Sequence, residues 1–153
     1  MRRMLLFLLA AFMLISTGAG ALAENRTETD EREEEAACIM QMKIGDQFAA
    51  VEWEDNESVL ALRELASDGL TIQMSMYGGF EQVGPIGRRL PSRDVQTVTN
   101  SGDIVLYAGS QIVVFYGSNS WAYTRLGRIT DKTPEEMRKL LGNGDVTITL
   151  TAD

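Results

Sequence analysis

Histidine is absent from this 153-residue chain. Its imidazole is the usual general base of serine and cysteine hydrolases and a ligand in most zinc and copper sites. The absence excludes histidine-dependent triads, dyads and the common metal clusters, and we expect neither a metal nor a cofactor.

Cysteine is nearly absent, because Cys38 is the only one. A single thiol excludes an internal disulfide. A lipid-modified cysteine would directly follow an apolar leader, whereas Cys38 follows the charged run Glu33-Glu34-Glu35. We therefore expect a half-buried thiol at the start of the first strand.

Long hydrophobic runs are also lacking, apart from residues 4–15. That run is too short to span a bilayer as a helix. Arg2 and Arg3 precede it and Ala21-Leu22-Ala23 follows it, an order typical of a signal peptide. We predict a signal peptide over residues 1–23, export of the protein, and no stable membrane insertion after cleavage. Retention as an uncleaved anchor is the alternative.

Positive charge is scarce, with 14 Lys and Arg against 22 Asp and Glu and a net charge of −8. Residues 24–37 hold seven of the carboxylates and almost nothing to bury, which predicts a disordered acidic linker. A basic stripe with interleaved aromatic residues is missing from the sequence, so nucleic acid is not an expected partner.

Beyond residue 38 the apolar residues mostly alternate with polar ones, which is typical of β-strands. Segments 39–44 and 47–53 flank Gly45-Asp46, a two-residue hairpin signal. A further strand is predicted over residues 70–74, with Leu70, Ile72 and Met74 on one face.

Two short helices interrupt this pattern. Asp55 or Asn56 can cap the first, which should end at Asp68-Gly69. Its predicted apolar face consists of Val59, Leu60, Leu62, Leu65 and Ala66. The sequence Thr133-Pro134-Glu135-Glu136 is typical of a capped start, and predicts a second helix that runs to Leu141 and stops at Gly142.

Residues 77–100 read mainly as a long loop, with one strand over residues 95–99. A hairpin of two very apolar strands, 104–107 and 112–116, follows around Ala108-Gly109-Ser110. The last predicted strand covers residues 145–150.

About eight short strands with one or two helices over residues 38–153 predict one mainly β domain, closed into a barrel because closure removes exposed strand edges. An open sandwich is the alternative.

Four segments carry a resemblance to a known family: 76–91, 101–107, 111–117 and 121–127. Together they resemble the bacterial cyclophilin-like domains, small β-barrels related in fold to the proline isomerases. The resemblance extends from about residue 42 to residue 129. It implies a cyclophilin-like β-barrel and raises the question of peptidyl-prolyl isomerase activity.

Isomerase activity needs an apolar pocket and a cation that hydrogen-bonds the prolyl nitrogen while the peptide bond crosses its barrier of roughly 18–20 kcal/mol. In cyclophilins the cation is an arginine on a barrel strand, and a tryptophan and a histidine complete the groove. This chain has no histidine, and its strand over residues 70–76 has no arginine. Arg88 or Arg89 could supply a cation instead, beside an apolar wall of Tyr77, Phe80, Tyr116 or Trp121.

A binding groove without catalysis is the favoured hypothesis. Glycine-rich turns let a backbone approach a ligand closely, and near them lie the aromatic residues Tyr77, Phe80, Tyr116, Trp121 and Tyr123. Arg88, Arg89 and Arg93 could hold a carboxylate or phosphate, and Glu81 could pair with one of them. We predict an exported peptide- or small-ligand-binding module, with isomerase activity as the alternative. The candidate site residues are Tyr77, Phe80, Glu81, Arg88, Arg89, Tyr116 and Trp121. The opposing hypothesis is that most of the rings are core.

Paired carboxylates for glycoside hydrolysis are the third class of site considered. Glu52, Glu54, Asp55 and Glu57 lie close in sequence, but a strand end followed by a helix start makes them capping and solvated groups. We do not expect hydrolase activity.

Overall fold

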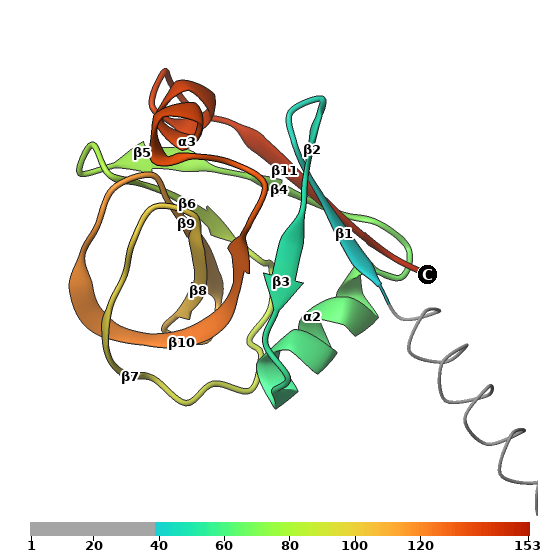
Figure 1. Cartoon of the computed structure of the whole chain (residues 1–153). Coiled ribbons are helices and arrows are strands. Elements are labelled where there is room, and N and C mark those ends of the chain that lie inside the picture. The colour runs from blue at the N-terminus through green and yellow to red at the C-terminus, as the bar shows by residue number, and fades with distance from the viewer. Residues whose placement is uncertain (1–38) are drawn as a thin grey trace, which may run out of the picture. The chain divides into compact units, whose positions relative to one another are not determined.

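The computed structural model describes residues 39–153. The expected signal peptide (1–23), the acidic linker (24–37) and Cys38 lie outside the described residues. The described part is mainly β, with two antiparallel sheets and two short helices (Figure 1). Neither of these helices has the length and apolar character that a membrane crossing requires.

The smaller sheet has four strands in the order β2-β1-β11-β4. Its strands are β1 (Met40–Ile44), β2 (Gln47–Ala49), β4 (Leu70–Gln73) and β11 (Thr147–Ala152). The predicted turn at Gly45-Asp46 joins β1 to β2 and is confirmed, with Ile44 opposite Gln47. Gly45 has a φ of 56°, which favours glycine at this turn.

The larger sheet has the order β3-β10-β8-β9-β6-β5, with β7 paired to β10. Its strands are β3 (Val51–Trp53), β5 (Ser75–Tyr77), β6 (Glu81–Pro85), β7 (Val95–Val98), β8 (Asp103–Tyr107), β9 (Gln111–Phe115) and β10 (Ser120–Ile129). The long strand β10, orange in Figure 1, curves and changes partner along its length. It pairs with β7 at its start, then with β8, and with β3 at its end.

Both predicted helices are present. Helix α2 (Glu57–Ala66) begins at Asn56, whose side chain accepts a hydrogen bond from the Val59 N–H at 3.0 Å. Helix α3 (Pro134–Leu141) begins at Thr133 with the reciprocal capping box that the sequence indicated. The predicted apolar face of α2 is wrong at Leu60, which is 50% exposed, whereas Val59, Leu62 and Ala66 of that face are buried.

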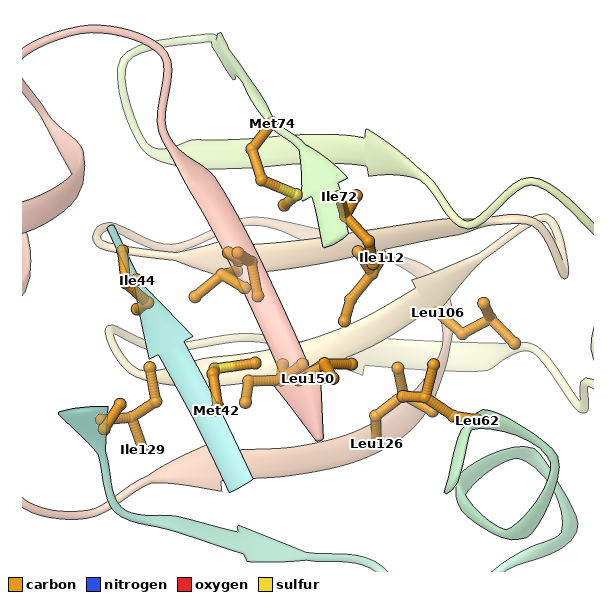
Figure 2. Packing of buried hydrophobic residues seen from close by; sticks show 14 of the residues in the cluster. Met42, Ile44, Leu62, Ile72, Met74, Leu106, Ile112, Leu126, Ile129 and Leu150 are labelled. Carbon is orange, nitrogen blue, oxygen red and sulfur yellow. The ribbon is translucent and has the colours of Figure 1, made fainter. Parts of the chain in front are cut away.

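The main hydrophobic core lies between the two sheets. Figure 2 shows side chains of the smaller sheet, such as Met42 and Leu150, facing Leu106, Ile112 and Leu126 of the larger one. The opposite face of the larger sheet is also covered, by a second cluster of Val105, Val113, Phe115 and Tyr123. Side chains alternate between the faces of a strand, so a sheet buried on both faces has nearly continuous apolar strands.

Three expectations need correction. Residues 81–85, read as part of a loop, form strand β6 between β9 and β5. The last strand is displaced towards the C-terminus, to Thr147–Ala152. The described residues contain eleven strands rather than about eight, because β5 and β6 are added and the segment 47–53 splits at Ala50 into β2 and β3, which join different sheets.

Candidate functional site

A cavity of about 320 Å³ opens on the second face of the larger sheet. Its lining consists of Tyr77, Glu81, Val83, Tyr107, Gln111, Val113, Asn119, Trp121 and Tyr123. These residues come from strands β5, β6, β8, β9 and β10 and from the turn that precedes β10. The volume lies near the lower end of the ~300–1,000 Å³ typical of ligand pockets.

Strand register explains why residues so far apart in sequence meet here. Tyr77 on β5 lies opposite Glu81 on β6, and Val83 lies opposite Val113 on β9. Tyr107 on β8 lies opposite Gln111. Directly opposed residues of antiparallel strands point to the same side of the sheet, so these pairs share the cavity face.

The cavity has an exposed rim and a buried floor. The Tyr77 and Trp121 rings at the rim are 66% and 57% exposed. Tyr123 and Glu81 on the floor are only 4% and 6% exposed. Large aromatic rings left in solvent around a buried polar group are typical of a binding surface rather than of a packed core.

Neighbouring groups fix Tyr123 in place. Its ring makes edge-on contacts with Tyr107 and Phe115, at centroid distances of 6.1 and 5.7 Å. Its hydroxyl oxygen accepts a hydrogen bond from the Asn119 side-chain amide at 3.0 Å. The backbone of Asn119 is held in turn, since its carbonyl accepts from the Thr99 N–H at 2.9 Å. The floor of the cavity is therefore a preorganised surface.

Glu81 carries the carboxyl group of the cavity floor. Its Oε2 atom finds no hydrogen-bond partner among residues 39–153. Burial raises the pKa of its carboxyl from 4.5 to about 7, because the charged form loses its hydration. Burial, and then the charge of Glu81, also raise the pKa of the Tyr123 hydroxyl. The described lining contains no lysine or arginine that would compensate the carboxylate.

Comparison of the sequence with models of protein families identifies the family of this domain. A sequence model of the cyclophilin-like family matches residues 42–151. The chain belongs to the cyclophilin-like family. The resemblance carried by segments 76–91, 101–107, 111–117 and 121–127 is thereby confirmed, and the matched span includes every residue that lines the cavity. The comparisons with curated proteins and with solved structures gave no match.

The cyclophilin-like domain brings three of the predicted site residues together in the cavity: Tyr77, Glu81 and Trp121. Phe80 lies beside them, packed against the second cluster. Its carbonyl accepts hydrogen bonds from the N–H groups of Tyr116 and Gly117, both at 2.9 Å. A Cβ on Gly117 would lie 2.6 Å from the Phe80 Cβ, so this close approach requires glycine.

The other predicted residues lie elsewhere. The Tyr116 side chain is buried in the core between the sheets, because it points to the opposite face from Phe115. Arg88 and Arg89 are exposed in the segment between β6 and β7 and do not line the cavity.

Sequence reasoning missed Val83, Tyr107, Gln111, Val113 and Asn119 as lining residues, and it noted Tyr123 only as one ring of an aromatic group. The predicted β8–β9 hairpin held a usable signal. Tyr107 and Gln111 flank its turn and must therefore lie opposite each other on one face.

Within the described part of the chain, no three carboxylate, thiol or imidazole side chains lie close enough together to hold a metal ion. Buried Asp103 instead forms ion pairs with Arg125 and Arg128, both at 3.4 Å.

Proposed function

We propose that this cyclophilin-like domain is a non-catalytic binding module, and that the cavity over β6, β8, β9 and β10 receives a small ligand or the side chain of a peptide. The observation that carries the proposal is the combination of exposed rings at the rim with a buried, unpaired carboxyl group on the floor. The grouping of the exposed Tyr77 and Trp121 rings around one cavity that also contains Glu81 supports a binding surface.

Isomerase activity receives less support. It needs a guanidinium at the centre of an apolar groove, but the described lining contains a carboxyl group and no guanidinium. Arg88 and Arg89 lie outside that lining. Accelerated cis–trans exchange of an alanine-proline peptide that disappears in Arg88→Ala or Arg89→Ala would restore the alternative.

Two further parts of the proposal concern the whole chain. We propose that the larger sheet belongs to a closed barrel. The curvature of β10 and the pairing of β10 with three different strands support this proposal. The predicted export of the protein, with the acidic segment 24–37 as a linker, remains part of the same proposal.

The binding function can be tested by screening a library of small fragments against the ¹⁵N-labelled full chain by NMR. We expect binding fragments to shift the Trp121 indole signal and the Gln111 and Asn119 side-chain amide signals. The Trp53 indole donates a hydrogen bond to the Met40 carbonyl outside the cavity and should not move.

Two matched substitutions complete that test. Trp121→Ala should weaken binding about fivefold, since an aromatic contact of this kind is worth about 1 kcal/mol. Phe48→Ala removes a ring of similar exposure, 60%, that lies outside the cavity lining. This substitution should leave the affinity for the fragments unchanged. Fragments that bind only away from the cavity, or equal effects of the two substitutions, would contradict the proposal.

A further inference from the structure

The chemistry of the cavity floor narrows the class of ligand. Glu81 presents a buried carboxyl group with one oxygen unpaired among the described residues, beneath a rim of three aromatic rings. We propose that the cavity binds a compact amine in its ammonium form, with Glu81 as the counter-charge. This inference rests on the proposed function, because it assigns a ligand class to the same cavity.

Charge complementarity is the first argument. A buried carboxylate is costly unless a cation or hydrogen-bond donors compensate it. An ammonium group supplies both, with a positive charge and three donors. The groups facing Glu81 from the neighbouring strands are Tyr77, Phe115 and Tyr123, none of them cationic. The buried carboxylate of Asp103 on β8 is already paired with arginines.

The aromatic rim is the second argument. Tyr77, Tyr107 and Trp121 surround the mouth of the cavity, and Tyr123 lies on its floor. Cations bind favourably over the faces of such rings, because the ring face carries negative electrostatic potential. The rings also offer apolar surface to the body of the ligand, and the cavity volume of about 320 Å³ suits a small molecule. A neutral alcohol would gain the apolar contacts but not the charge pairing.

The pH dependence of binding follows from Glu81. The other ionisable side chains of the cavity lining are the phenols of Tyr77, Tyr107 and Tyr123, and no second carboxyl group lines the cavity. With a pKa of about 7, the ionised fraction of Glu81 falls about thirtyfold between about pH 8 and about pH 5.5. Alkylammonium groups remain charged throughout that range. Amine affinity should therefore fall about thirtyfold on acidification, because Glu81 loses its charge.

The experiment compares benzylamine with benzyl alcohol, which has nearly the same size and shape but no charge. Binding of each to the full chain is followed through the Trp121 indole signal. We expect benzylamine to bind at least about tenfold more tightly than the alcohol near pH 8. This advantage should disappear near pH 5.5.

Two carboxamide variants identify the counter-charge. Glu81→Gln should weaken the binding of benzylamine at least about tenfold. The same substitution should change the affinity for benzyl alcohol by less than about threefold. Glu52→Gln alters an exposed carboxylate on β3, outside the cavity lining, and should leave both affinities unchanged.

The outcomes separate this inference from the proposed function. Equal binding of amine and alcohol, or equal losses in both carboxamide variants, would overturn the amine assignment while the cavity remains a binding site. Failure of both probes to shift the Trp121 signal would also overturn the amine assignment. If the fragment screen were silent as well, the proposed function would fall with it.

Discussion

Among single residues, we expect Glu81 to affect both binding and stability. Its position on β6, opposite Tyr77 and Phe115, takes the carboxyl group out of water without giving Oε2 a partner among the described residues. Such a group costs stability whenever it is ionised, and a ligand that neutralises it recovers that cost. The same desolvation that destabilises the domain would therefore strengthen the binding of a cation.

Burial of Glu81 predicts a pH dependence of the free energy of unfolding. The folded pKa of about 7 lies above the ordinary value of 4.5, so the folded state keeps its proton longer than the unfolded state. The stabilising proton is fully present below pH 4.5 and is lost as the pH rises to 7. We expect the free energy of unfolding to fall by roughly 3 kcal/mol across this window, as measured by urea unfolding.

Glu81→Gln should abolish this decrease and leave the domain more stable than the wild type near neutral pH. Glu52→Gln should retain the decrease. Glu136 acts in the opposite direction and at lower pH, because the Thr133 N–H lowers its pKa. A pH slope that survives in Glu81→Gln would show that another group produces it.

Local sequence features grouped three of the candidate residues correctly in space, and their role in binding stays a prediction. Aromatic rings and a carboxylate beside glycines identified Tyr77, Glu81 and Trp121, which do lie together. Tyr116 could not be assigned to a face in this way. It follows Phe115 in a strand buried on both sides, and a continuous apolar run does not reveal which residues face the core and which the cavity.

At the scale of helices and strands, prediction from the sequence was correct where characteristic turn or capping residues mark the ends of an element. Gly45-Asp46, Ala108-Gly109-Ser110 and the Thr133 capping box gave two hairpins and a helix in the predicted places. Strand β6 escaped prediction because Gly84 and Pro85 are both unfavourable in strands. Tertiary contacts require the glycine there, since a Cβ on Gly84 would lie 2.8 Å from the Gln73 backbone oxygen.

Asn56 tests how helix α2 is attached to the larger sheet. Its Oδ1 caps the helix, and its Nδ2 donates to the Arg125 carbonyl on β10 at 2.9 Å. Asn56→Ala removes both interactions and should destabilise the domain by about 2 kcal/mol in urea unfolding. Asn56→Ser keeps a good cap but loses the bond to β10, so it should cost about 1 kcal/mol.

The neighbouring exposed residue Asp55 provides the control, and Asp55→Ala should change stability by less than about 0.5 kcal/mol. Equal losses in Asn56→Ala and Asn56→Ser would mean that only the tie to β10 matters.

For the molecule as a whole, the important arrangement is a sheet with two occupied faces. One face packs on the smaller sheet and α2 to form the main core, and the other carries the cavity. The mainly β class and the cyclophilin-like family were predictable from strand spacing and from short motifs. The cavity was not, because its lining is assembled from five strands whose register depends on long-range pairing.

The most direct test of the account is a crystallographic fragment screen on the full chain. We predict electron density for a bound fragment between the Glu81 carboxyl group and the rings of Tyr77 and Trp121. Fragments bound only at other surfaces, or a Trp121 ring folded inward to fill the cavity, would contradict the claim that this face of the larger sheet is a ligand-binding site.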